Sequence, residues 1–175
     1  NASPNDVHYS GRATPTWFGA FRNDLCWSNF ALSFNIVYKL GYVFRRSSFT
    51  GYLSRNNTWQ HRDYVNAWKK PGDETFTNVP GFMDDYSDKR YEVYSYSDIL
   101  VERGDHIRLQ DIRFSYELPV TVLNKIRLSG VSFYTYCNNI GILWRANKHK
   151  IDPDAVSFGT TPMPRTVAIG MNVVF

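Results

Sequence analysis

Asp152 and Asp154, separated by one residue, are a pair of side chains that could do acid–base chemistry or hold a metal ion. Two carboxylates can act as a general acid and a general base, or as oxygen ligands of a cation. A site of either kind needs further support, and neither a third acidic partner nor a histidine at ligand spacing accompanies this pair. The two aspartates are therefore interpreted as side chains that cap their own loop.

The remaining candidates for catalysis are scattered. Four histidines are spread over the sequence: His8, His61, His106 and His149. None of them lies in a Ser/His/Asp or Cys/His arrangement with supporting sequence context. Cys26 and Cys137 are far apart and lie in no CxxC or metal-type spacing, so both are expected to be free thiols. The sequence thus predicts no enzyme, no cofactor and no metal site.

The composition is that of a folded chain with many aromatic residues. The 175 residues are 43% hydrophobic, 21% charged and 17% aromatic. The formal charge of +4 is spread out, without a Lys/Arg block that would track phosphates, so no nucleic-acid partner is expected. No run of about 18 apolar residues occurs, which excludes a membrane-spanning helix, whereas membrane-spanning strands escape that test. The polar start at Asn1 fits an internal starting point in a longer precursor.

Alternation of apolar and polar residues with period two marks the expected strands. It is longest over 30–44, where every second residue from Phe30 to Phe44 is aromatic or aliphatic. A strand of a globular domain rarely exceeds about 10 residues, whereas strands of a membrane barrel can project beyond the bilayer. The other expected strands are 17–27, 106–118, 128–143 and 164–175.

Charged side chains of these strands fall on one parity and aromatic side chains on the other, which suits a wet barrel lumen and a lipid exterior. On the lumen they could hold a plug, line a substrate path or simply be solvated. The residues assigned to the lumen are Arg22, Asp24, Lys39, Asp111, Arg113 and Glu117. Arg108 and Gln110 share the parity of Ile112, and are expected near the outer rim, where their side chains could reach lipid head groups.

The lengths of the connections test the barrel interpretation independently, because outer-membrane barrels have long outer loops and short inner turns. Counted back from Phe175, the connections alternate in length: 144–163, 119–127, 45–105 and the turn at 28–29. The outer loops are therefore 45–105 and 144–163. The longer one is expected to be folded, with a short helix at 61–70. Its tryptophans and one at the last loop could stack on a ligand or form small loop cores: Trp59, Trp68 and Trp144.

Motifs in a fixed order run over nearly the whole chain. They are TPTWFGAF at 14–21, AWKKPGD at 67–73 with VP at 79–80, VERGDHIRLQDIRFSYELP at 101–119, the segment 134–140, DPD at 152–154, PRT at 164–166, Gly170 and Phe175. Together they resemble the SusC/RagA family, TonB-linked outer-membrane proteins that import glycans or peptides with a surface lipoprotein partner. The sequence departs from the family pattern at 137–140, and 82–96 matches none of its motifs.

The resemblance implies an all-β fold, a multi-pass transmembrane antiparallel β-barrel of about 22 strands around an N-terminal plug, in the bacterial outer membrane. Residues 1–175 would form about the last five strands, with the plug outside this chain. An open sheet is excluded from lipid because each unmet backbone group costs several kcal/mol there, so the remaining strands must come from a longer precursor or a second chain. The resemblance also implies that Phe175 is a signal for barrel assembly; it could equally be an ordinary aromatic residue of the barrel's girdle, and one residue can be both.

The partners that the resemblance implies are a SusD/RagB-like surface lipoprotein, the TonB complex through the missing N-terminal part, the remaining barrel and plug segments, outer-membrane lipid, and a glycan or peptide substrate. Two other functions compete with import. A soluble all-β carbohydrate-binding module would also be rich in aromatic residues, but the long strand at 30–44 opposes it. A glycoside-hydrolase sandwich would need two carboxylates on facing strands, for which Asp111 and Glu117 are the residues to test.

Overall fold

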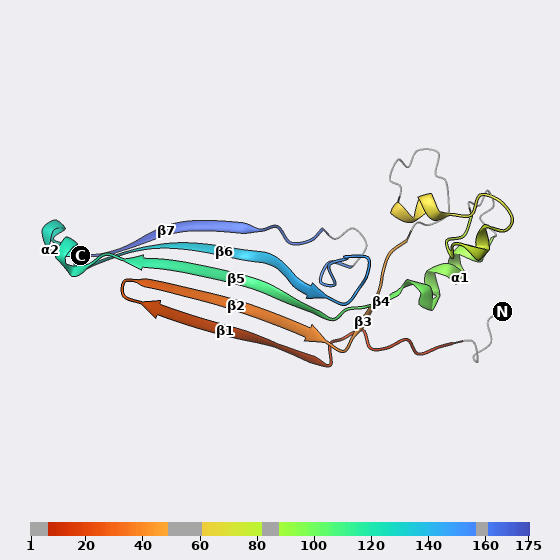
Figure 1. The fold of residues 1–175 in the computed structure, drawn as a ribbon, viewed down its shortest axis with the longest axis horizontal. Helices are drawn as coiled ribbons and strands as arrows, with labels where there is room; N and C mark the ends of the chain where they lie inside the picture. The colour runs from red at the N-terminus through yellow and green to blue at the C-terminus, as the bar shows by residue number, and fades with distance from the viewer. Residues whose placement is uncertain (1–6, 49–60, 82–87, 157–160) are drawn as a thin grey trace.

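The computed structural model describes residues 7–48, 61–81, 88–156 and 161–175, and most of it is one antiparallel sheet (Figure 1). The strands lie in the order β1-β2-β5-β6-β7. Their bounds are β1 Trp17–Trp27, β2 Phe30–Leu40, β5 His106–Glu117, β6 Gly130–Arg145 and β7 Thr166–Val174. The predicted antiparallel arrangement of about five strands is confirmed, and β1 and β7 form the two edges of an open sheet.

The single strand predicted over 30–44 is wrong in length, because β2 ends at Leu40. Gly41 has a left-handed φ of 76°, and the chain turns there before a separate strand, β3 Val43–Arg45, pairs with β4 Val101–Arg103. Tyr42 and Phe44 continue the alternation past this break, but they are buried near the β3–β4 pair and do not extend the exposed apolar face of β2. Tyr42 lies on Gly104, where an added Cβ would come within 2.4 Å of its ring.

One end of the sheet carries the short connections (Figure 1). Ser28, with φ 53°, and Asn29 form the two-residue turn between β1 and β2, and the Asn29 amide donates to the carbonyl of Glu117 at 3.0 Å. The connection 119–127, expected only to be short, contains the helix α2 Val120–Ile126, which begins after Pro119. The C-terminus lies at the same end.

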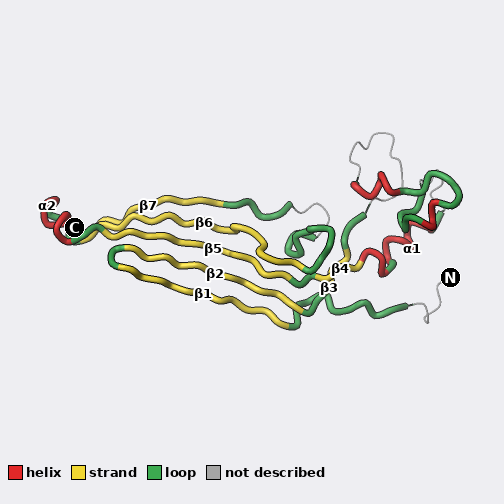
Figure 2. The backbone as a smooth tube through the Cα atoms, viewed as in Figure 1, coloured by secondary structure: helices red, strands yellow, loops and turns green. Residues whose placement is uncertain are grey.

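The long segment between β2 and β5 lies at the opposite end and has its own structure (Figure 2). It contains 3₁₀ helices at Arg62–Asn66, Asp73–Thr75 and Asp98–Leu100, and the helix α1 Arg90–Tyr96. The helix expected at 61–70 is thus only the first of these, because Ala67 is extended. The buried apolar cluster of this segment comprises Ala67, Val79, Tyr91, Tyr94 and Leu100. Among the described helices, none has both the length and the apolar character needed to cross a membrane.

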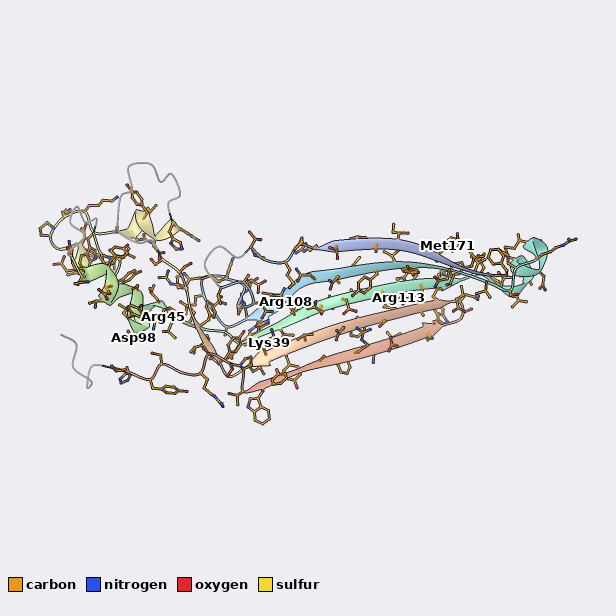
Figure 3. All side chains as sticks on the ribbon, turned by 180° about the vertical axis from the view of Figure 1, so that it is seen from behind. Lys39, Arg45, Asp98, Arg108, Arg113 and Met171 are labelled. Atoms are coloured by element: carbon orange, nitrogen blue, oxygen red, sulfur yellow. The ribbon has the colours of Figure 1, made fainter. Side chains whose placement is uncertain are left out.

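The strand register gives the sheet two unlike faces. The apolar face carries Trp17, Phe21, Leu25, Trp27, Phe30, Leu32, Phe34, Ile36, Tyr38, Leu40, Ile112, Phe114, Tyr116, Phe133, Val167, Ile169 and Met171. The polar face carries Arg22, Asp24, Ser33, Asn35, Lys39, Asp111, Arg113, Ser115, Glu117, Tyr134, Tyr136, Asn138 and Asn172. Side chains project from both sides (Figure 3).

The apolar face is exposed. Phe21 retains 56% of its accessible surface and Ile169 82%, although an antiparallel sheet in water packs its apolar face against a core. In the part of the chain that the structure describes, the apolar cluster lies in the long connecting segment rather than under the sheet. The sheet thus leaves its apolar face uncovered, and several residues of the polar face, such as Arg22 and Asp24, are exposed as well.

Candidate functional site on the polar face

An ion pair across three strands lies near the middle of the polar face. Arg22 of β1 places Nη2 at 3.2 Å and 3.3 Å from the two carboxylate oxygens of Asp111 on β5. Asn35 of β2, which pairs with both residues, donates from Nδ2 to Asp111 Oδ2 at 3.1 Å. The Asp111 side chain is 6% exposed and that of Arg22 55%. The carboxylate is thus embedded in the wall, whereas the guanidinium lies at its surface.

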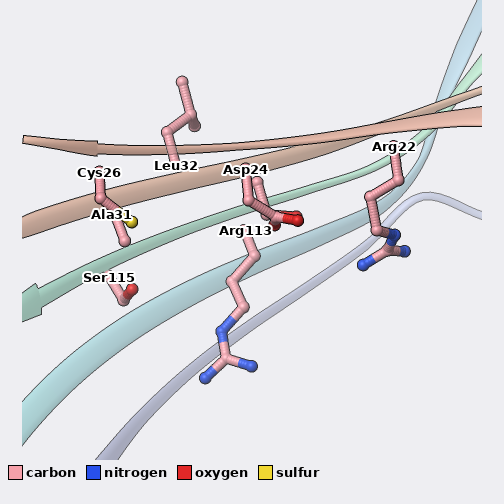
Figure 4. Close-up of a pocket in the computed structure, with 8 residues that line it drawn as sticks. Arg22, Asp24, Cys26, Ala31, Leu32, Arg113 and Ser115 are labelled. Atoms are coloured by element: carbon pink, nitrogen blue, oxygen red, sulfur yellow. The ribbon is translucent and has the colours of Figure 1, made fainter.

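A shallow hollow lies beside this pair, towards the β1–β2 turn (Figure 4). Its lining residues are Arg22, Asp24, Cys26, Ala31, Leu32, Ser33, Arg113 and Ser115. In Figure 4 the side chains of Arg22, Asp24 and Arg113 lie on one side of the strands and that of Leu32 on the other. The Arg113 guanidinium carbon is 4.8 Å from the centre of the Tyr134 ring, a cation–π contact between β5 and β6.

Arg108 is the residue whose placement the alternation gets wrong. In the register of β2 and β5, Asn35 pairs with Asp111 but the next pair is Ile36 with Leu109, so Gln110 is an extra residue in β5. A β-bulge of this kind reverses the side-chain parity beyond it. Arg108 therefore shares the polar face with Asp111 and is buried, instead of pointing with Ile112 towards lipid head groups.

The loop 146–156 folds against the polar face at the end where Arg108 lies, through Asp152 and Asp154. Asp152 Oδ1 lies 2.5 Å from Arg108 Nη2. Asp154 is contacted by Lys39 Nζ at 2.7 Å, His106 Nε2 at 3.3 Å and Arg108 Nη2 at 3.4 Å. The backbone N–H of Asp154 also donates to Asp152 Oδ1 at 3.0 Å. The two aspartates thus cap their loop, as expected, and also tie it to β2 and β5.

The ion pairs around Asp154 lower the pKa of its carboxyl group. The His106 ring and the Lys39 ammonium hold the pKa of the Asp154 carboxyl well below its usual range, although burial acts in the opposite direction. Buried groups continue the network beneath it. His106 Nδ1 lies 2.9 Å from the Gly104 carbonyl and 3.2 Å from the Tyr42 hydroxyl, and Arg108 donates to Asn139 Oδ1 at 2.7 Å.

The structure brings all six predicted lumen residues onto the polar face, at different positions along the strands. Arg22, Asp24 and Arg113 line the hollow, and Asp111 lies next to them. Lys39 belongs to the cluster at the loop end, and Glu117 lies at the α2 end of β5. His106, Arg108, Asn139 and the Tyr134 ring are functional candidates that the alternation missed. His106 and Arg108 were missed because the extra residue Gln110 changes their face, and the composition of the segment does not show such an insertion.

The aromatic residues predicted to bind substrate are not brought together. Trp59 lies outside the described residues. Trp68 lies in the long segment, and its indole N–H donates to the carbonyl of Thr77 at 2.5 Å. Trp144 pairs with Ile107 and is on the apolar side of β6, 48% exposed. Phe175, the predicted assembly signal, follows the last residue of β7 and is 92% exposed.

The arrangement is suited to holding charged partners rather than to bond making. In the described ranges, no group of three or more His, Cys, Asp or Glu side chains is placed to hold a metal ion. The carboxylates of Asp111, Asp152 and Asp154 are each engaged by a cationic side chain. What the geometry provides is a sheet with fixed charges on one face and an apolar surface on the other.

Comparison with known proteins agrees with this architecture, although no family model matches the chain. Two receptors of Formosa agariphila are similar over 99% of the chain: TonB-dependent receptor P26, 26% identical over 198 residues, and TonB-dependent receptor P3, 27% identical over 192 residues. The chain spans 18% of the length of each of these relatives.

Solved structures of the RagAB peptide importer share the fold. The "closed-closed" and "open-open" states match with TM-scores of 0.71 and 0.70 at 19% identity, and a further structure of the RagAB peptide transporter matches with 0.68 at 20% identity. Each match covers 100% of this chain and 19% of the chain compared. By sequence and by fold, the chain is therefore similar to one section of a TonB-dependent receptor.

Proposed function

We propose that the sheet is a section of the wall of an outer-membrane β-barrel through which oligosaccharides or peptides are imported by TonB-dependent transport. The observation that carries the proposal is the pair of unlike faces: exposed aliphatic and aromatic side chains on one face, and the Arg22–Asp111 pair with its neighbours on the other. Lipid favours the first face and a water-filled lumen the second. In this proposal about 22 strands close around a plug.

The connections support an orientation. The β1–β2 turn and α2 lie at one end of the sheet, and the long segment and the loop 146–156 lie at the other (Figure 1). Outer-membrane barrels have short periplasmic turns and long extracellular loops. We therefore assign the end with α2 to the periplasm and the end with α1 to the cell surface. The loops there are the surface on which a SusD/RagB-like lipoprotein would dock, an expectation supported by the likeness to the RagAB importer.

The predicted lumen residues have roles within this proposal. Arg22, Asp24, Arg113 and Glu117 face the plug or the transported substrate, and Asp111 orients Arg22. Phe175, on the parity of Ile169 and Met171, acts as the signal that the insertion machinery reads.

The faces can be tested with nitroxide labels on β7 of the full-length receptor in outer membranes. Cys26 and Cys137 are first replaced by Ser, and single cysteines are placed at Ile169 and Met171, or at the matched neighbours Ala168 and Asn172. We expect labels at 169 and 171 to be accessible to oxygen and shielded from a water-soluble nickel complex, and labels at 168 and 172 to show the reverse. Equal access of the nickel complex to all four labels would contradict the proposal and favour a soluble module.

A further inference from the structure

We propose that Lys39, His106 and Arg108 form a binding site for a carboxylate of the transported ligand, and that the protein's own Asp154 occupies this site until a ligand displaces it. The inference rests on the proposed function only in treating the polar face as the side that meets the ligand. Three basic side chains from two strands converge on the Asp154 carboxylate at 2.7, 3.3 and 3.4 Å. Such a group of donors recognises a carboxylate whichever molecule carries it.

The two aspartates of the loop are held differently. Asp152 is 14% exposed and forms the short 2.5 Å contact with Arg108, whose side chain is 8% exposed. Asp154 is 34% exposed, and its closest partner Lys39 is 36% exposed. Water and a ligand can therefore reach the Lys39–Asp154 pair, whereas the Arg108–Asp152 pair is covered. Asp152 is the anchor of the loop, and Asp154 is the carboxylate that can exchange.

Buried donors of the site are left without a hydrogen bond. His106 is fully buried, and its Nε2 forms an ion-pair contact with Asp154 at 3.3 Å but no hydrogen bond of good geometry among the described residues. Arg108 Nε, also buried, has no partner among them either. Unmet buried donors are costly, so their presence indicates a position that another acceptor is meant to fill. A carboxylate seated deeper than that of Asp154 could accept from them.

The geometry of His106 directs a proton towards this position. The Tyr42 hydroxyl lies 3.2 Å from Nδ1 and can donate to it, which leaves the ring proton on Nε2. If Nδ1 instead donates to the Gly104 carbonyl at 2.9 Å, Nε2 carries a proton only when the ring is charged. Nε2 can donate to a carboxylate in the first arrangement and in the charged form of the second. Loss of the contacts to Asp154 would also free the loop 146–156 from β2, since Lys39 is the β2 residue that holds it.

The test measures binding of acidic probes to the purified full-length receptor by calorimetry. The probes are tetraglutamate and tetragalacturonate, which present carboxylates on a peptide and on a sugar, with tetraserine as the neutral control. We expect Asp154→Ala to bind at least one acidic probe roughly tenfold or more tightly than the wild type, because the competing internal carboxylate is gone. The probe that gains identifies the source of the carboxylate. Lys39→Met added to Asp154→Ala should return the affinity to the wild-type level.

The control for net charge is Asp98→Ala, which removes an exposed carboxylate among the loops, away from Lys39 and Arg108 (Figure 3). If Asp154→Ala fails to fold, Asp154→Asn removes the charge without changing the shape of the side chain. Equal affinities of the wild type and the Asp154 variant, or an equal gain in Asp98→Ala, would overturn the proposal. Neither result bears on the lipid exposure of β7, so failure of this proposal is distinct from failure of the barrel assignment.

Discussion

Arg22 on β1 and Asp111 on β5 are joined across the full width of β2, with Nη2 at 3.2 and 3.3 Å from the two carboxylate oxygens. Because Asp111 is 6% exposed, Arg22→Met leaves an embedded carboxylate with Asn35 as its remaining partner. We expect a loss of about 1–3 kcal/mol in the free energy of unfolding of the full-length protein, measured by urea titration in detergent. Asp111→Asn should cost less, because the half-exposed Arg22 can turn to water. Equal losses for both variants would show that the embedding of Asp111 is unimportant.

Gly170 of β7 is required by the ring of Tyr134 on β6. A Cβ added at Gly170 would lie 2.4 Å from Cζ and from the hydroxyl oxygen of Tyr134. Gly170→Ala should displace the ring from the Arg113 guanidinium and lower the free energy of unfolding of the full-length protein by about 1–3 kcal/mol, measured in the same titration. Gly130→Ala is the matched control, since its Cβ would meet Val174 at an ordinary 3.6 Å. An unchanged free energy of unfolding in Gly170→Ala would mean that the Tyr134 ring can move aside without destabilising the protein.

Period-two alternation could predict the strands, because successive residues of a strand lie on opposite faces and the two faces of this sheet carry different residue types. β1 and β2 follow it from Trp17 to Leu40 with one hairpin turn and no insertion. The same signal fails at Gly41 and Gln110 for two different reasons. Beyond Gly41 the alternating residues belong to a new strand that packs among loops, and at Gln110 one extra residue exchanges the two faces. Neither change alters the apolar content of the segment.

The loop contacts could not be predicted, because they join residues that are distant in sequence. Asp154 reaches Lys39, a separation of 115 residues, and no local pattern marks the two as partners. The loop-capping role of Asp152 and Asp154 was predictable, since it depends on residues that are two positions apart. Their second role, as partners of Arg108, also required the bulge that turns Arg108 to the polar face.

Acid should release the loop 146–156. The folded-state pKa of Asp154 is below its unfolded value of about 3.9, so the stabilisation is complete above that value and is lost as the pH falls from it through the folded-state pKa. The charged or titratable groups that face Asp154 are Lys39, His106, Arg108 and Asp152. We expect equal hydrogen-exchange protection of the loop at about pH 7 and pH 5, and a loss below about pH 4. In Asp154→Asn the loop should be weakly protected at every pH. If the wild-type loop lost protection between pH 7 and pH 5, a titratable group other than Asp154 would control it.

The long outer segment should depend on Asp63. Arg46 Nη1 lies 2.5 Å from Asp63 Oδ2, the Ser48 hydroxyl donates to the same oxygen at 2.6 Å, and both charged residues are buried. Asp63→Ala leaves Arg46 buried without its carboxylate, at a local cost of about 3 kcal/mol. We expect faster proteolysis within 61–100 on intact cells, with unchanged amounts of receptor in the membrane. Asp98→Ala, in an exposed position, is the control. Unchanged proteolysis in Asp63→Ala would mean that the apolar cluster holds the segment alone.

An alanine inserted between Asn35 and Ile36 tests whether the bulge sets the two faces of the sheet. The added residue would pair with Gln110, and continuous pairing beyond it would carry Lys39, Arg108 and His106 to the apolar face, away from Asp152 and Asp154. In the proposed barrel, this change exposes basic side chains to lipid or head groups and breaks the contacts that hold the loop. We expect a strong decrease in folded receptor in the outer membrane, measured as heat-modifiable mobility on gels. Deletion of Gln110 is the control, because it removes the bulge while Ile36 still pairs with Leu109 and Arg108 stays on the polar face, so it should retain much more folded receptor. Equal losses in the two variants would mean that the disturbance of the strands, and not the exchange of faces, prevents folding.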